Sequence, residues 1–220
     1  MTAGEGFATS TIGRKAVMAV TGLILAGFVL GHMVGNLQVY LGPEAMNHYA
    51  EFLREALHGA GLWIARAVLL LSVILHIWAA ASLTLQARRA RPVGYRRWVA
   101  QESTFASRTM RWSGVIVALF VVYHVLHLTT GTVHPDFQPG DVYHNFIAGF
   151  RSVPASLFYM AAMGALTLHL RHGFWSLFQT LGVSHPRFIA LLKTAAMLFA
   201  AVILIGNLSF PIAVLMGWIG

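Results

Sequence analysis

The stretch that decides the fold covers residues 62–85 and reads LWIARAVLLLSVILHIWAAASLTL. Its only charged side chain is Arg66, and its only histidine is His76. A helix needs about 20 largely apolar residues to cross roughly 30 Å of hydrocarbon, so this stretch predicts a transmembrane helix. Four other stretches also qualify, and the five predicted spans are residues 16–41, 62–85, 113–130, 154–178 and 189–218. We therefore expect an all-α integral membrane protein, a five-helix bundle forming one domain over residues 1–220.

The composition agrees with a membrane protein and excludes some chemistry. The chain is 57% hydrophobic and 10% charged, whereas soluble domains average about 25% charged residues. It has no cysteine, so disulfides and a cysteine-held iron–sulfur cluster are excluded from this chain. Histidine is abundant instead, with eleven residues against seven acids.

The basic residues predict how the bundle is oriented, because short cytoplasmic loops carry an excess of Lys and Arg. With the N-terminus in the cytoplasm and the C-terminus outside, only Arg54, Arg66 and Arg151 lie on the outer side. The inner side then holds the other basic residues: Arg14, Lys15, Arg88, Arg89, Arg91, Arg96, Arg97, Arg108, Arg111, Arg171, Arg187 and Lys193. We expect a multi-pass protein of the inner (cytoplasmic) membrane whose net charge of +8 contacts anionic lipid headgroups and not nucleic acid.

Two outer segments differ in pattern. Residues 43–57 space their apolar side chains as a helix does, and Pro43 suits a first helical turn. They predict a short helix on the outer surface. Residues 133–151 contain Pro135, Pro139 and Gly140, which predicts an irregular outer loop.

Four predicted spans each carry a histidine at membrane depth: His32, His76, His124 and His169. Ionisable residues inside a bilayer are costly and mark functional sites, and a neutral imidazole is an axial ligand of haem iron. The alternative for any one of them is a hydrogen bond to a neighbouring helix. Four such residues on four helices favour haem ligation.

Helix geometry divides these histidines into two tiers. Counted from the outer ends at about 1.5 Å per residue, His32 and His124 lie about 15 and about 10 Å deep. By the same count His76 and His169 both lie about 22 Å deep. Two histidines on different helices at each depth suit two stacked haems. His127 leaves the outer ligand open, since it lies one turn beyond His124 and would move that haem outward.

Five short motifs, taken together, resemble those of a known family. The resemblance covers nearly the whole chain and is carried, in order, by LGHMVGNLQ at 30–38, GPEAMN at 42–47, LH at 75–76, YH at 123–124 and HLRHGFWS at 169–176. The chain resembles the cytochrome b membrane anchor of succinate:quinone oxidoreductase (respiratory complex II) in its five-helix, two-haem form. The resemblance implies that His76 and His169 hold the haem nearer the iron–sulfur subunit and that His32 and His124 hold the other. It also favours His124 over His127.

The resemblance further implies partners and a function. An FAD-bearing flavoprotein subunit and an iron–sulfur subunit would lie on the cytoplasmic face, docked by the basic inner loops. With two haem b groups, this chain would pass electrons to a membrane quinone, either menaquinone or ubiquinone. It would serve succinate oxidation in the tricarboxylic acid cycle, or fumarate reduction, without acting on succinate itself.

Secondary contacts follow from residue type near the predicted inner surface. Ser10, Arg14, His172 and Trp175 are candidates for a quinone region, which needs hydrogen-bond donors beside an apolar slot. Arg14, Arg171 and, in the outer half of its span, Arg66 are candidates for haem propionates. The competing interpretation for each is snorkelling or an aromatic belt at the membrane surface.

Other functions also fit parts of this pattern. A haem-free anchor, or a cytochrome b anchor of a different dehydrogenase, would share the five spans. A polytopic transporter could use the same intramembrane histidines to transfer protons. The haem content and the proteins that copurify would discriminate among these alternatives.

Overall fold

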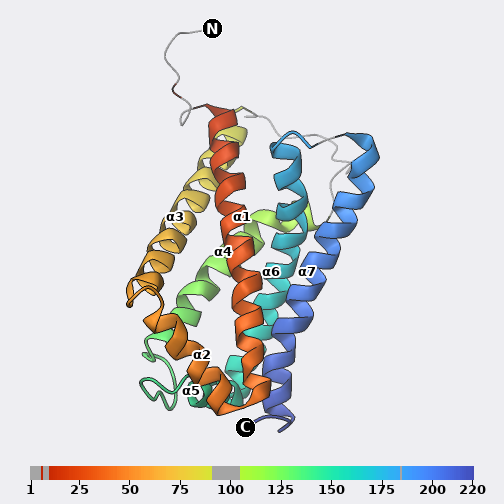
Figure 1. The fold of residues 1–220 in the computed structure, drawn as a ribbon. Helices are drawn as coiled ribbons and strands as arrows, with labels where there is room; N and C mark the ends of the chain where they lie inside the picture. Colours follow the sequence, from red (N-terminus) through yellow and green to blue (C-terminus); the bar gives the residue numbers. More distant parts are fainter. Residues whose placement is uncertain (1–5, 7–9, 91–104, 184) are drawn as a thin grey trace.

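The computed structural model describes residue 6 and residues 10–90, 105–183 and 185–220, and over these residues the regular structure is entirely helical (Figure 1). Within these described ranges, five helices are long and apolar enough to cross a membrane, which confirms the predicted class. They are α1 (Thr11–Asn36), α3 (Ala60–Arg89), α4 (Phe105–His124), α6 (Val153–Thr180) and α7 (Pro186–Leu215). A 3₁₀ segment, η1 (Leu37–Leu41), extends α1, and a π-helical segment, η2 (Val125–Thr129), extends α4.

The ends of these helices have local causes. Ser10 caps α1, because its side chain accepts a hydrogen bond of 3.0 Å from the backbone N–H of Gly13. Gly42, at φ 97°, ends η1 and turns the chain into α2 (Pro43–Glu55), since glycine adopts positive φ without strain. The structure therefore contains a short helix where the sequence predicts one.

Helix α4 begins at Phe105 and not near residue 113, as the sequence predicts. The additional turns carry Arg108 and Arg111. A hydropathy pattern detects only the part of a helix that lies in hydrocarbon, whereas backbone hydrogen bonding continues beyond it. The predicted span is the apolar part of a longer helix.

The prediction of an irregular loop over residues 133–151 is wrong in its second half, which forms α5 (Val142–Arg151). Asp141 caps this helix by accepting a hydrogen bond of 2.9 Å from the N–H of His144. Phe146 and Phe150, one turn apart, are buried, and α5 packs on α6 and α7. The hydrophobic face of α5 is buried by tertiary packing, which the prolines before it do not reveal.

Helix α2 is tied to the start of α5 by a polar side chain. The Asn47 side chain donates to Asp141 Oδ1 at 3.0 Å and accepts from the N–H of Tyr143 at 3.0 Å. The hydrogen bonds from the His144 N–H and the Asn47 amide hold the pKa of Asp141 below its usual range. These contacts join the two short helices at the same end of the bundle, near the C-terminus (Figure 1).

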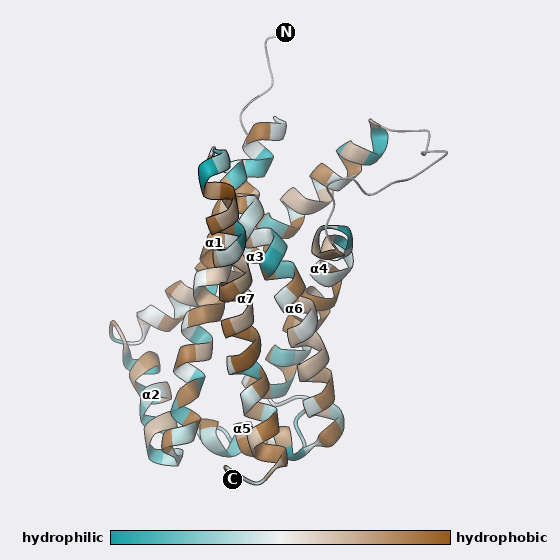
Figure 2. Ribbon diagram, turned by 90° about the vertical axis from the view of Figure 1, so that its right-hand side faces the viewer, coloured by the Kyte–Doolittle hydropathy of each residue, from teal (hydrophilic) through white to brown (hydrophobic). Residues whose placement is uncertain are grey.

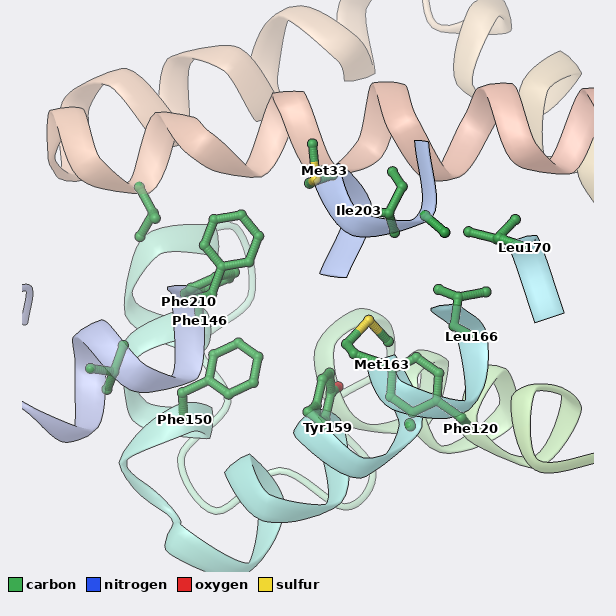
Figure 3. Packing of buried hydrophobic residues seen from close by; sticks show 14 of the residues in the cluster. Met33, Phe120, Phe146, Phe150, Tyr159, Met163, Leu166, Leu170, Ile203 and Phe210 are labelled. Carbon is green, nitrogen blue, oxygen red and sulfur yellow. The ribbon is translucent and has the colours of Figure 1, made fainter. Parts of the chain in front are cut away.

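The apolar side chains face both inward and outward, as expected for a protein in hydrocarbon. Leu70, Leu119 and Ile205 on three different long helices are 63%, 65% and 69% exposed. Figure 2 shows hydrophobic residues along the lengths of the long helices and hydrophilic residues mainly toward their ends. The buried core lies among α1, α4, α5, α6 and α7, and includes Phe120, Tyr159, Met163 and Ile203 (Figure 3). An apolar surface of this extent is suited to lipid and not to water.

The long helices cross the bundle in alternate directions, so α1, α4 and α7 begin, and α3 and α6 finish, at one end. We call this the basic end, because its described residues include Arg14, Lys15, Arg88, Arg89, Arg108, Arg111, Arg171, Arg187 and Lys193. Arg91, Arg96 and Arg97, which the orientation prediction also uses, lie outside the described residues. The side of the membrane to which the basic end belongs stays a prediction.

Candidate functional site

Histidines from α3 and α6 meet in the middle of the bundle. The ring centroids of His76 and His169 lie 6.3 Å apart, with an interplanar angle of 61°. Helix α1 packs on α3, and α4 packs on α6. Helix α1 therefore lies behind His76, and α4 lies behind His169. We call His76 and His169 the inner pair.

Each imidazole of the inner pair is backed by a hydroxyl from the neighbouring helix. Thr21 Oγ1 lies 3.1 Å from Nδ1 of His76, and Ser113 Oγ lies 3.4 Å from Nδ1 of His169. Both hydroxyls already donate to backbone carbonyls, at 2.7 Å to Val17 and 3.0 Å to Met110. Each hydroxyl oxygen is therefore left to accept the Nδ1–H of its histidine, which keeps the lone pair of Nε2 for a metal ion.

Both histidines also depend on a glycine at the contact. A Cβ on Gly22 would lie 3.3 Å from Cε1 of His76, and a Cβ on Gly114 would lie 3.4 Å from Cε1 of His169. The two supports share one sequence pattern, MAVTG at 18–22 and MRWSG at 110–114. The sequence analysis missed Thr21 and Ser113, and this recurring pattern is the signal that points to them.

The second pair lies toward the other end of the bundle. The ring centroids of His32 on α1 and His124 at the end of α4 are 5.8 Å apart, and the rings are nearly perpendicular at 86°. His32 stacks on Phe28 at 5.3 Å, and Nδ2 of Asn36 lies 3.4 Å from its Nε2. Nδ1 of His124 lies 3.2 Å from the hydroxyl of Tyr159. We call His32 and His124 the outer pair.

His127 lies apart from this pair. It is in the π-helical segment η2 and only 1% exposed. Its ring stacks on Tyr123 at 5.3 Å and faces His134 at 5.0 Å. A Cβ on Gly149 would lie 2.9 Å from its Cε1, so the surrounding chain already encloses the ring. The geometry favours His124 as the partner of His32.

The spacing of the rings fits two imidazoles on one metal ion. The ring centroids are 6.3 Å apart in the inner pair and 5.8 Å apart in the outer pair, which leaves the two imidazoles of each pair close enough to share one metal ion with metal–nitrogen bonds of about 2 Å. Ligation by Nε2 of His32 would replace its contact with Asn36. Within the described part of the chain no group of three or more His, Asp or Glu side chains could hold a metal ion, so each pair offers two imidazoles and no further side-chain ligand of these types.

The remaining predicted residues lie in several places. Arg66 is exposed on α3, with its guanidinium 4.9 Å from the centre of the Trp63 ring, a contact that fits snorkelling at the membrane surface. Arg171 is exposed on α6. Trp175 is half-buried beneath Nζ of Lys193, at 5.4 Å.

Three of the predicted residues lie at or approach the basic end. Ser10 caps α1, and His172 is half-buried one turn after His169. Arg14 is half-buried, and its Nε is fully buried without a hydrogen-bond partner among the described residues. A buried guanidinium nitrogen without an acceptor is costly. Among the predicted contact residues, Arg14 is therefore the one with a buried hydrogen-bond donor that lacks an acceptor.

The comparison with protein families settles which group of proteins this is. A family model described as the transmembrane subunit of succinate dehydrogenase/fumarate reductase matches residues 87–208, more than half of the chain. The chain belongs to this family. No curated protein and no solved structure matches it. As a transmembrane subunit of this family, the chain is a membrane anchor of complex II, associated with the soluble subunits of that enzyme.

Proposed function

We propose that this anchor binds two haem b groups and carries electrons from the iron–sulfur subunit to a membrane quinone. The observation that carries the proposal is the arrangement of four histidines on four helices as two facing pairs. At about 1.5 Å per residue, the inner pair lies about 16–20 Å from the basic end and the outer pair about 29–32 Å. The two pairs therefore lie at successive depths.

The residues of this chain would hold and tune the haems. Haem supplies a one-electron iron centre, and the protein sets its ligands, its orientation and its surroundings. His76 with His169 and His32 with His124 are the proposed axial ligands. The hydroxyls of Thr21 and Ser113 orient the inner imidazoles and, by accepting their Nδ1–H, make them more basic ligands.

The basic end indicates the direction in which electrons would cross the anchor. Its arginines and lysines complement an acidic partner surface and lie on the cytoplasmic side by the positive-inside rule. The iron–sulfur subunit would dock there, with the flavoprotein subunit beyond it, and the C-terminus would lie outside. This places the inner pair nearer the source of electrons in a cytoplasmic membrane.

Arg14 is the best-supported contact for a further group at the basic end. Its unpartnered Nε suits a haem propionate or a quinone oxygen, both of which accept hydrogen bonds from a guanidinium. Ser10, His172 and Trp175 complete the proposed quinone region, and Arg171 is proposed as a second propionate contact. The proposed quinone is menaquinone or ubiquinone.

The experiment that tests this function is purification of the anchor from its own membrane. We expect a flavoprotein and an iron–sulfur protein to copurify, with two b-type haems per anchor chain in the reduced-minus-oxidised spectrum. An anchor that copurifies with both partners but carries no haem would overturn the haem assignment. A haem-bearing chain without either partner would overturn the assigned direction of electron transfer.

A hydroxyl-to-alkyl substitution tests the support of the inner pair. Thr21→Val and Ser113→Ala each remove the hydroxyl beside the Nδ1–H and leave the backbone carbonyl of Met18 or Met110 as its acceptor, so the ligand becomes less basic and ferric haem is less favoured. A hydrogen bond of about 1 kcal/mol corresponds to about 40 mV for a one-electron couple. We expect the inner haem's midpoint potential to rise by about that amount, as measured by optical redox titration.

Thr109→Val is the matched control for these two variants. Thr109 Oγ1 donates only to the backbone carbonyls of Phe105 and Ala106 on its own helix. This variant should leave both potentials unchanged. Equal shifts in all three variants would show that the effect comes from helix α4 or α1 in general and not from the histidine contacts.

A further inference from the structure

One hydroxyl lies between the two neighbouring histidines of α4 and η2. The Tyr159 hydroxyl is 3.2 Å from Nδ1 of His124 and 3.1 Å from Nδ1 of His127. Tyr159 is 6% exposed and is held by edge-on contacts with Phe120 at 5.0 Å and Phe150 at 4.9 Å; it lies in the buried cluster of Figure 3. A ring packed this tightly keeps its hydroxyl in place between the two imidazoles.

The number of protons fixes the direction of these hydrogen bonds. A phenol has one proton to donate and can also accept a hydrogen bond. If Nε2 of His124 binds iron, its Nδ1 carries the proton and donates it to the Tyr159 oxygen. The phenol proton must then be donated to Nδ1 of His127, which accepts it and carries its own proton on Nε2.

The next histidine is fixed by the backbone. Nε2 of His134 lies 2.8 Å from the carbonyl oxygen of Asn145 and therefore donates to it, while its Nδ1 accepts the N–H of Asp136 at 3.0 Å. The His134 ring lies 5.0 Å from the His127 ring. The His134 ring beside His127 is therefore neutral. No carboxylate is among these contacts, so none competes for the protons that His124 donates to Tyr159 and that Tyr159 donates to His127.

We propose that Tyr159 is the positioning residue of the outer haem: its shared hydroxyl orients His124 toward the iron and couples the potential of that haem to His127. The inference rests on the proposed function, because it requires an outer haem. It also explains why His127, though close to His124, is enclosed: it is the acceptor for the phenol proton and not a second candidate ligand.

The inner pair lacks this arrangement. There the hydroxyl proton goes to a backbone carbonyl, which side-chain substitution does not remove. At the outer pair the corresponding acceptor is the His127 side chain. Because linked hydrogen bonds polarise one another, a change at His127 should reach His124 through Tyr159. A substitution at His127, which reaches His124 only through Tyr159, should therefore change the midpoint potential of the outer haem and not that of the inner haem.

The test is a redox titration of each haem in the intact complex, followed by optical and EPR spectra. In Tyr159→Phe we expect both haems to be retained, the outer midpoint potential to rise and the inner one to stay unchanged. His127→Leu should raise the outer potential by a smaller amount, because the phenol loses its acceptor. His127→Gln should restore it, since the amide oxygen accepts the phenol proton.

Tyr123→Phe is the matched control, because Tyr123 stacks on His127 but does not share these hydrogen bonds. It should leave both potentials unchanged. If Tyr159→Phe loses the outer haem, the His127 variants decide: a shift in His127→Leu that is reversed in His127→Gln supports the inference. An outer potential unaltered in His127→Leu, with both haems present, overturns it and leaves the proposed function standing. Absence of haem from the wild-type complex would instead overturn the proposed function itself.

Discussion

Replacing His169 with alanine should remove one of two haems from the complex and leave the other in place, and His76→Ala should do the same. Each substitution removes one of two axial ligands from the inner pair, whose rings face each other at 6.3 Å. The outer pair uses His32 and His124 and should be retained. Haem extracted per anchor chain should fall from about two to about one, and the difference spectrum should lose one component.

His172→Ala is the matched control for this prediction. His172 lies on the same helix one turn further on and belongs to neither of the two facing pairs. It should leave two haems per chain, and copurification of the soluble subunits should show that all three variants assemble. Retention of both haems in His76→Ala and in His169→Ala would show that the inner pair does not bind haem.

The second large effect concerns the two histidines on either side of the start of η2. We expect His124→Ala to abolish binding of the outer haem and His127→Gln to preserve it. His124 faces His32 at 5.8 Å, whereas His127 is 1% exposed and enclosed by Tyr123, His134 and Gly149. Haem content per chain and the EPR signal of the outer haem are the measurements.

Glutamine is used at position 127 because it preserves a polar group in a buried position. Alanine there would leave a cavity and an unpartnered phenol, which would lower stability for reasons unrelated to haem. His32→Ala provides the positive control, since it should lose the same haem as His124→Ala. Loss of the outer haem in His127→Gln with retention in His124→Ala would reverse the assignment.

Much of the fold was predictable because the bilayer imposes a length. The five apolar stretches correspond to the five long helices, since hydrocarbon thickness sets how many apolar residues a span needs. The polar first turns of α4, with Arg108 and Arg111, were not predicted, because they extend past that limit. Helix α5 was not predicted because its apolar residues, Phe146 and Phe150, are buried by packing against other helices, which the local pattern after two prolines does not show.

The candidate site divides in a similar way. Counting residues along helices places His76 and His169 at one depth and His32 and His124 nearer the outer ends, because helix rise is constant. The count leaves His124 and His127 open, since one turn is within the uncertainty of a helix end. The tertiary structure separates them, because α5 and His134 enclose the His127 ring, whereas the His124 ring faces His32 on α1.

The sequence by itself determined that this chain is an all-helical membrane protein with histidines on four of its five spans, and its motifs indicated the family to which it belongs. These properties depend on composition, spacing and residue order, which are local. The tertiary structure decided which side chains support the imidazoles of His76, His169 and His124: Thr21, Ser113 and Tyr159 lie on helices far away in the chain. A hydrogen bond between helices depends on how their faces pack, so even the pattern shared by residues 18–22 and 110–114 does not specify which histidine each hydroxyl contacts.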